Sequence, residues 1–123
     1  MSMNILIVED SALIRARLLD LFACIPGNKI IRTAATLSLG MECVKSAWPM
    51  LVILDIQLPD GNAIGSISQM KKMLPGLDVM VLTNDASAFN RQKCQQAGAT
   101  LFFDKSTEFE TLLEVVQQQL VSI

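Results

Sequence analysis

The sequence predicts an α/β domain in which a parallel β-sheet carries helices on both faces, the doubly wound arrangement. Five short apolar runs alternate along the chain with five stretches whose apolar residues recur at helical spacing. The connections are short and contain no linker, repeat or low-complexity tract. Alternation of this kind implies parallel strands joined by right-handed crossovers. With 123 residues, of which 51% are hydrophobic and 18% charged, the chain predicts one domain spanning residues 1–123.

The apolar run at residues 50–54 is the centre of this prediction. Five consecutive apolar residues suit a strand that is buried on both faces, as in a parallel sheet. Asp55 follows directly, and Pro59 and Gly61 are turn formers, so the strand should end at Asp55. In an open α/β sheet, ligands bind outside the carboxyl ends of the strands. Asp55 is therefore the first candidate for a reactive group.

Spacing and caps place the first two helices on either side of a second strand. Ser11 is a good N-cap for a helix whose apolar residues recur from Ile14 to Ile25, before Pro26 stops it. A weaker helix containing Gly40 follows the second strand. The expected strands of this half are 4–8, 29–34 and 50–54, and the expected helices are 12–25 and 36–47.

The second half repeats the alternation. Gly98 is a typical C′ residue for the fourth helix. Thr107 and Glu110 have the spacing of a capping box for the last helix, whose apolar stripe runs from Phe109 to Leu120. The expected helices of this half are 63–73, 87–97 and 109–120, and the expected strands are 78–82 and 100–103.

Polar side chains follow four of the predicted strands. Glu9 and Asp10 follow the first strand, Asp55 the third, Thr83 the fourth, and Lys105 comes just after the fifth. The carboxyl ends of parallel strands lie along one edge, so these side chains should meet there. Lys105 could then pair with Asp55 as a point charge, and Thr83 could donate to an oxygen held on Asp55. A solvated lysine and a capping hydroxyl are the simpler alternatives for each residue alone.

Three carboxylates at one edge also predict a metal site. Glu9 and Asp10 alone could only charge the first turn of the following helix, where acids are favourable by about 0.3–1 kcal/mol. Next to Asp55, however, they would repel one another unless a cation intervened. Hard oxygen ligands of this kind suit Mg²⁺, which takes one or two carboxylates together with waters and phosphate oxygens.

Composition excludes several classes of function. Ten basic and twelve acidic side chains give a net charge of −2, which argues against direct nucleic-acid binding. The chain has no histidine, so it lacks the commonest general base and metal ligand. No apolar stretch is long enough to span a membrane, and no basic segment suggests a signal peptide. The three cysteines are widely spaced, which predicts neither a disulfide framework nor a zinc site and fits a reducing cytoplasm.

Four segments at strand ends carry a resemblance to a known family. They are residues 7–11 (IVEDS), 52–61 (VILDIQLPDG), 81–84 (VLTN) and 98–105 (GATLFFDK). With these segments the chain resembles, over essentially its whole length, the receiver domain of two-component response regulators, including the single-domain chemotaxis regulator. The resemblance implies a flavodoxin-like sheet with strand order 2-1-3-4-5.

The resemblance also assigns roles to individual residues. It implies that Asp55 is the phosphoacceptor and that Mg²⁺ is bound by Asp10, Asp55 and the backbone carbonyl of Gln57, with Glu9 in support. Lys105 matches the lysine that contacts the phosphoryl group. Thr83 matches the hydroxyl that moves to the phosphoryl oxygen, and Phe102 the aromatic residue that follows it inward.

On this resemblance, the protein is a switch and not a conventional enzyme. A sensor histidine kinase or phosphotransfer protein would donate the phosphoryl group, and water would later remove it. The change would alter the surface of the fourth helix, fifth strand and fifth helix, which would control a partner or an output domain. Homodimerisation through this surface is a family-level expectation.

The sequence departs from the family pattern in three places. Ser106 stands where the family often has a proline after a cis bond, which leaves the isomer of the Lys105–Ser106 bond open. Phe102 replaces a frequent tyrosine. Gln57 and Asp85 flank the route of the attacking water and are expected to tune the lifetime of the phosphoryl group.

Three alternatives remain at this point. A haloacid-dehalogenase-like phosphatase also phosphorylates an aspartate at a strand end, but it carries a second acid where this chain has Gln57. A receiver-like module could bind partners without phosphorylation, although the set of Asp10, Asp55, Thr83 and Lys105 is complete. The chain could also be a fragment of a longer regulator.

Overall fold

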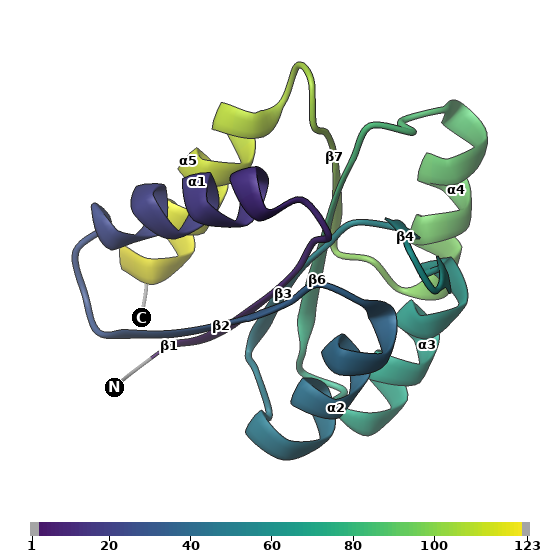
Figure 1. The fold of residues 1–123 in the computed structure, drawn as a ribbon, viewed down its shortest axis with the longest axis horizontal. Helices are drawn as coiled ribbons and strands as arrows, with labels where there is room; N and C mark the ends of the chain where they lie inside the picture. The colour runs from purple at the N-terminus through teal and green to yellow at the C-terminus, as the bar shows by residue number, and fades with distance from the viewer. Residues whose placement is uncertain (1–2, 122–123) are drawn as a thin grey trace.

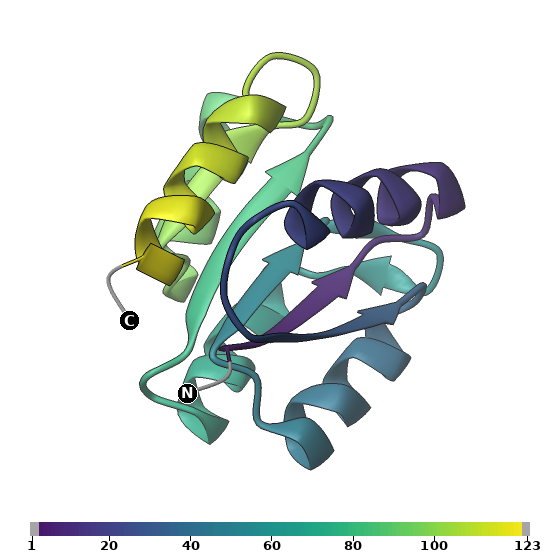
Figure 2. The same cartoon turned by 90° about the vertical axis from the view of Figure 1, so that its left-hand side faces the viewer.

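The computed structural model describes residues 3–121, and its centre is a five-stranded parallel sheet. The strands are β1 (Met3–Val8), β2 (Lys29–Ala34), β3 (Leu51–Leu54), β6 (Asp78–Thr83) and β7 (Leu101–Asp104). They lie in the order β2-β1-β3-β6-β7, and Figure 2 shows their arrows pointing the same way. Counted within this sheet alone, the order is 2-1-3-4-5. The predicted doubly wound fold is confirmed.

Five helices cover the two faces of the sheet. They are α1 (Ala12–Ala23), α2 (Leu37–Ala47), α3 (Ile64–Met73), α4 (Ala88–Ala97) and α5 (Phe109–Val121). Helices α1 and α5 lie together on one face, and α2, α3 and α4 lie on the other (Figure 1). Their bounds agree with the predicted ones to within two residues. Within residues 3–121, none of these helices has the length and apolar composition needed to cross a bilayer.

The central strand β3 is buried on both faces, which explains its uninterrupted apolar sequence. Val52 and Leu54 pack into the cluster beneath α2, α3 and α4. Leu51 and Ile53 point the other way, into the cluster beneath α1 and α5. Strand β1 divides its side chains in the same manner. Alternate residues of one strand thus belong to two separate cores, as the period of two requires.

Hydroxyl caps define the starts of three helices, and of these the sequence analysis predicted the one at Ser11. In each case a hydroxyl oxygen accepts a hydrogen bond from the backbone N–H three residues on. The pairs are Ser11 with Ile14 (3.3 Å), Thr36 with Leu39 (3.2 Å) and Ser87 with Asn90 (3.1 Å). Gly98 ends α4 with φ at +109°, a conformation that favours glycine.

The start of α5 differs from the predicted capping box of Thr107 and Glu110. Instead, the Glu108 carboxylate accepts from the backbone N–H of Asp104 at 3.0 Å, and the Asp104 carbonyl accepts from the N–H of Glu108 at 2.8 Å. The reciprocal pair therefore lies in the turn before the helix, because Asp104 at the end of β7 supplies the first partner. The predicted apolar stripe is otherwise observed, although the side chain of Leu120 lies outside the described residues.

The segment after Asp55 forms a small hairpin where the sequence predicted only a turn-rich loop. Strand β4 (Gln57–Leu58) pairs with β5 (Gly61–Asn62) in antiparallel register. At its tip, the carboxylate of Asp60 accepts hydrogen bonds from the N–H groups of Leu37 and Ser38, at 2.8 and 3.0 Å. These donors are free N–H groups in the first turn of α2. The hairpin is thereby tied to a neighbouring helix.

Gly40 allows α2 to approach the sheet closely. A Cβ atom built on Gly40 would lie 2.9 Å from Cγ2 and 3.1 Å from Cγ1 of Val8. Val8 is a β-branched, fully buried residue of β1 and has little freedom to move aside. Gly40 lowers the intrinsic stability of α2 as a helix, but it allows α2 to pack closely against β1.

Candidate functional site

Three carboxylates converge at the carboxyl edge of the sheet. Glu9 and Asp10 follow β1, and Asp55 follows the adjacent strand β3, as the sequence predicted. One oxygen from each carboxylate lies within 4.8 Å of the others. Glu9 and Asp55 are only 3% and 6% exposed, whereas Asp10 is exposed to solvent. We call these three residues the acidic corner.

Lys105 joins the acidic corner from the turn after β7. Its Nζ donates to Glu9 Oε1 at 2.5 Å and to Asp55 Oδ2 at 2.9 Å. The predicted pairing with Asp55 is therefore present, and the second pairing with Glu9 was not foreseen. The backbone N–H of Lys105 donates to the carbonyl of Thr83 at 2.9 Å, so the turn is fastened to the end of β6.

Burial and charge act in opposite directions on this cluster. Burial by itself disfavours the charged form of Lys105, but hydrogen bonds and attraction from Glu9 and Asp55 outweigh it, so its pKa is raised. Burial raises the pKa of Glu9, although hydrogen bonds from Lys105 and the Ser11 N–H partly oppose this change. Lys105 is consequently a cation at neutral pH and the main counter-charge to the buried acids.

The backbone after β3 orients the Asp55 carboxylate. Oδ1 accepts from the N–H of Gln57 at 3.1 Å, while Oδ2 accepts from Lys105. The N–H of Asp55 itself donates to the carbonyl of Val8 at 3.0 Å, which continues the ladder between β1 and β3. The carboxylate is thus held at both oxygens and still faces the edge of the sheet.

Gln57 and Asp85 face each other across this edge. Gln57 Nε2 donates to Asp85 Oδ2 at 3.2 Å, and the carbonyl of Asp85 accepts from Asn90 Nδ2 of α4 at 3.1 Å. The sequence analysis singled out both residues, because each lies two positions after a candidate site residue: Gln57 after Asp55, and Asp85 after Thr83. Their direct contact links the hairpin after β3 to the first turn of α4.

Thr83 and Phe102 lie on the adjacent strands β6 and β7. Thr83 is fully buried, and its Oγ1 accepts from the N–H of Asp85 at 3.2 Å. Phe102 is 9% exposed and is covered by the guanidinium of Arg91, whose Cζ lies 4.6 Å from the ring centroid. Arg91 also donates to the carbonyl of Phe102 at 3.1 Å and forms an ion pair with Glu108 at 3.4 Å.

Sequence reasoning missed Arg91, Glu108 and Arg15. Arg91 of α4 forms an ion pair with Glu108 in the turn before α5, and no sequence pattern predicts that contact. Arg15 lies in the second turn of α1, and its Nη1 donates to the carbonyls of Glu9 and Asp10. A basic residue shortly after an acidic pair at a helix start could have been noticed.

The Lys105–Ser106 bond, whose isomer the sequence did not decide, is trans, as are all peptide bonds of the described residues.

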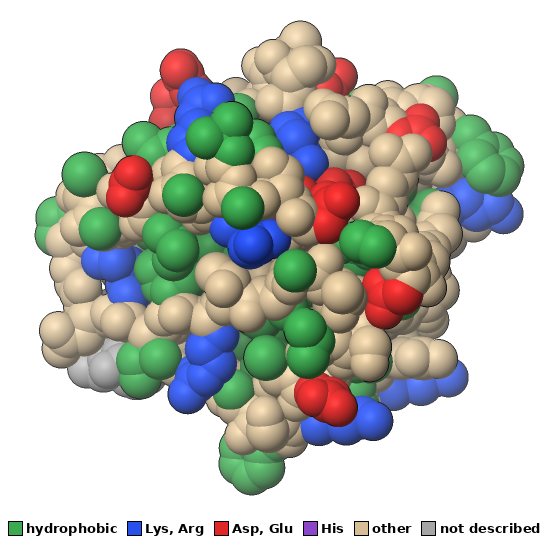
Figure 3. All heavy atoms as spheres, in the orientation of Figure 1, with side chains coloured by type: hydrophobic (Ala, Val, Ile, Leu, Met, Phe, Trp, Pro, Cys, Tyr) green, Lys and Arg blue, Asp and Glu red, His purple; other side chains and the backbone are tan. Residues whose placement is uncertain are grey.

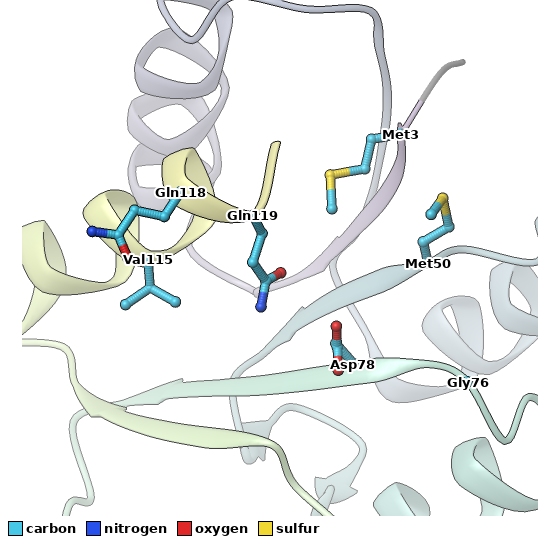
Figure 4. A pocket seen from close by; sticks show the side chains of 7 residues that line it. All are labelled: Met3, Met50, Gly76, Asp78, Val115, Gln118 and Gln119. Atoms are coloured by element: carbon cyan, nitrogen blue, oxygen red, sulfur yellow. The ribbon is translucent and has the colours of Figure 1, made fainter. Parts of the chain in front are cut away.

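A cavity of about 850 Å³ opens at the opposite edge of the sheet, away from the acidic corner. Figure 4 shows side chains from the amino ends of β1, β3 and β6 facing the last turns of α5. Its lining residues are Met3, Met50, Gly76, Asp78, Val115, Gln118 and Gln119. The acidic corner, in contrast, lies at the carboxyl edge, where Asp10 is exposed and Glu9 and Asp55 are nearly buried. The cavity and the cluster of candidate site residues are therefore at opposite edges of the sheet.

Comparison with known proteins identifies the family. The model of the response regulator receiver domain matches residues 5–117. This chain belongs to that family. Its strand order and the sheet edge on which its acids meet agree with this assignment. The receiver is also similar to a solved CheY-like receiver domain protein from Methanospirillum hungatei, with a TM-score of 0.86 and 25% identity, covering 99% of this chain and 96% of that one.

Curated relatives of the receiver are longer proteins. The transcriptional activator DevR/DosR of Mycobacterium tuberculosis is 27% identical over 93% of this chain and 52% of its own length. A protein-glutamate methylesterase/protein-glutamine glutaminase of Treponema denticola is 27% identical over 97% of this chain and 34% of its own length. The chain thus spans about half or less of these relatives, and what they share with it is the receiver.

Proposed function

We propose that this receiver is a Mg²⁺-dependent phosphoacceptor in two-component signalling, phosphorylated on Asp55 by a histidine kinase or phosphotransfer protein. The observation that carries the proposal is the position of Asp55. Its carboxylate lies at the end of β3, faces Glu9 and Asp10, and accepts a hydrogen bond from Lys105 at 2.9 Å. Membership of the receiver family favours this function over the phosphatase alternative.

The donor set of the acidic corner fits a magnesium ion. It offers three carboxylates with oxygens within 4.8 Å of one another, and oxygen is the ligand atom that Mg²⁺ prefers. Asp10, Asp55 and the backbone carbonyl of Gln57 would hold the ion, with Glu9 in support. When bound, the ion would neutralise charge on phosphoryl oxygens.

The chain's own residues would perform the transfer. An Asp55 oxygen attacks phosphorus as the bond between phosphorus and the donor's imidazole nitrogen breaks, and the imidazole keeps the electron pair. An acyl phosphate forms on Asp55, and water later hydrolyses it. Lys105 supplies a fixed positive charge for the phosphoryl oxygens. Such a site acts mainly through position and charge, which a preformed cluster at the end of rigid strands provides.

The switch would work through residues beside the acidic corner. We propose that Thr83 donates to a phosphoryl oxygen and that Phe102 moves with it, which changes the surface of α4, β7 and α5. Contacts of Asp85 with Gln57 and Asn90 connect the acceptor loop to α4 and support this route. A downstream protein, an output domain or a second copy of the receiver would bind the altered surface.

The receiver would act as a switch rather than as a turnover enzyme, as one domain over residues 1–123. Its expected partners are proteins, because charges of both signs are interspersed on the face in Figure 3 and the net charge is −2. DevR/DosR is a DNA-binding activator, so a regulator containing this receiver could act on transcription through another domain. Free thiols at Cys24, Cys43 and Cys94 support a cytoplasmic location.

The decisive experiment is intact-mass measurement after incubation with Mg²⁺ and acetyl phosphate. We expect one phosphoryl adduct on the wild-type protein, none on Asp55→Asn, and none after EDTA is added beforehand. Asp20→Asn, which changes an exposed acid of α1, is the matched control and should label normally. Equal labelling of Asp55→Asn would remove Asp55 from its role. No labelling of the wild type, with Mg²⁺ binding also absent, would favour the phosphorylation-independent interaction module.

A further inference from the structure

Arg15 reaches back from α1 to the two residues that begin the acidic corner. Its Nη1 donates to the carbonyl of Glu9 at 2.7 Å and to the carbonyl of Asp10 at 3.0 Å. Arg15 is half-buried against this turn. One guanidinium nitrogen therefore binds two consecutive carbonyls of the segment that leaves β1.

These two hydrogen bonds restrain two successive peptide planes, Glu9–Asp10 and Asp10–Ser11. Because one donor holds both carbonyls, the backbone torsions at Asp10 are restrained, and with them the direction in which its side chain leaves the backbone. Glu9 has additional restraints, because its N–H donates to Ala34 at 2.9 Å and its Oε2 accepts from the Ser11 N–H at 2.9 Å. Its carboxylate would keep its direction without Arg15.

Asp10 lacks such restraints. Its side chain is exposed, and within residues 3–121 its carboxylate accepts no hydrogen bond and forms no ion pair. The direction of this carboxylate is therefore set by its backbone. Arg15 is the side chain that holds that backbone.

We propose that Arg15 is a positioning residue for divalent metal binding at the acidic corner. It does not contact the ion. It orders the Glu9–Asp10 turn before the ion arrives, so the ion does not have to order that turn. Hydrogen-bond partners of metal ligands commonly act in this way. The inference rests on the proposed metal site and adds a residue that the site itself does not contain.

A competing effect has the opposite sign. The guanidinium is positive, and its charge alone would repel a cation, so removing it would tighten binding. That charge is directed to two carbonyl oxygens and lies on the backbone side of the turn, whereas the carboxylates face Asp55. We therefore expect positioning to outweigh repulsion. The two effects also differ in salt dependence, because added salt screens the repulsion but leaves the hydrogen bonds in place.

The test is the dissociation constant of Mg²⁺, measured by titration calorimetry on the wild type, Arg15→Met and Arg15→Lys. We expect Arg15→Met to bind about tenfold more weakly, in line with other hydrogen-bonded supports of metal ligands. Arg15→Lys should fall between the two, because an ammonium group keeps the charge and replaces the geometry only in part. The loss should persist at high salt.

The matched control is Arg17→Met, which removes the same charge from the same helix. Arg17 lies over the ring of Phe109 at 4.2 Å, and within residues 3–121 it forms no hydrogen bond or ion pair with Glu9 or Asp10. Its Mg²⁺ affinity should stay within twofold of the wild type. Labelling by acetyl phosphate gives a second readout: Arg15→Met should need more Mg²⁺ for half-maximal labelling but reach the wild-type rate at saturation.

Several results would overturn the inference. Arg15→Met could bind Mg²⁺ as tightly as the wild type or more tightly, or Arg17→Met could show the same loss. A labelling deficit that saturating Mg²⁺ does not restore would also contradict a positioning role. If Arg15→Met does not fold, Arg15→Lys with wild-type affinity counts against the proposal in the same way. A wild-type protein that binds no Mg²⁺ would refute the proposed metal site itself and the inference with it.

Discussion

Lys105 is a buried cation that pairs with two residues of the acidic corner. Its side chain is 9% exposed and contacts two carboxylates whose side chains are 4% and 7% exposed. A buried ion pair contributes little net stability when intact, but removing one partner leaves an uncompensated buried charge. Here the removal of one cation would leave two such charges side by side.

We predict that Lys105→Ala destabilises the metal-free protein by about 3 kcal/mol. Mg²⁺ should still bind and should restore part of this loss, because it replaces the missing positive charge. Activation by phosphorylation should be weakened. Urea unfolding with and without Mg²⁺ measures the first two effects, and Lys72→Ala on the exposed side of α3 is the control. Unchanged stability without Mg²⁺ would show that Lys105 is not the main counter-charge.

At the scale of elements, two contacts hold α2 in place. Asp60 of the hairpin caps its first turn, and Gly40 brings its middle onto β1. The hairpin also carries Gln57, whose N–H holds the Asp55 carboxylate. The packing of α2 is therefore connected to the geometry of the proposed phosphoacceptor.

The cap at Asp60 should make stability depend on pH. Hydrogen bonds from Ser38 and Leu37 lower the pKa of Asp60 below its usual value of 3.8. A carboxyl with a lowered folded pKa stabilises the protein fully above its unfolded pKa, and this stabilisation disappears as pH falls through the folded pKa. We predict that Asp60→Asn is less stable than the wild type at pH 6 and that the difference shrinks below about pH 4. Urea unfolding at several pH values tests this, and a pH-independent difference would contradict it.

Gly40 and Gly65 provide a matched pair of helical glycines. Gly40→Ala should destabilise the protein by about 1–2 kcal/mol, because the added methyl group overlaps Val8 and outweighs the better helix propensity. Gly65→Ala on α3 meets nothing within 4 Å and should stabilise by about 0.5–1 kcal/mol. Chemical denaturation of both variants decides the matter. Equal effects of the two substitutions would show that the contact with Val8 is not limiting.

At the scale of the whole molecule, the parallel sheet gathers residues that are far apart in the chain. Lys105 and Glu9 are separated by 96 positions and Lys105 and Asp55 by 50, yet all three meet at one edge. A ligand bound there contacts the ends of several strands at once. Binding should therefore stabilise the global fold rather than one segment.

We predict that Mg²⁺ raises the thermal midpoint of the wild-type protein in a concentration-dependent manner. At a hundredfold excess over the dissociation constant, mass action contributes about 2.7 kcal/mol. Asp10→Asn should lose most of this shift without lowering the metal-free midpoint, because the Asp10 carboxylate has no partner within residues 3–121. Differential scanning calorimetry with Mg²⁺ or EDTA measures both. The same rise in Asp10→Asn would exclude that residue as a metal ligand.

Local sequence determined the elements of this receiver and the edge at which its polar residues meet. Apolar runs, the cap at Ser11 and the terminating residue Gly98 depend on neighbours within a few positions, so they could be predicted. The two-sided burial of β3 followed from its unbroken apolar sequence. The convergence of Asp55 with the acids after β1 followed from the rule that parallel strands share one carboxyl edge.

Contacts between distant segments were decided only by the tertiary structure. The pairing of Lys105 with Glu9, the cap that Asp60 provides for α2, and the stacking of Arg91 on Phe102 join elements whose separation and rotation no local pattern encodes. The start of α5 was mispredicted although the contact there is local: Glu108 pairs with the backbone of Asp104, four positions earlier at the end of β7. A long polar side chain can reach several hydrogen-bond acceptors, and the packing of the elements decides which of these acceptors lies close to it.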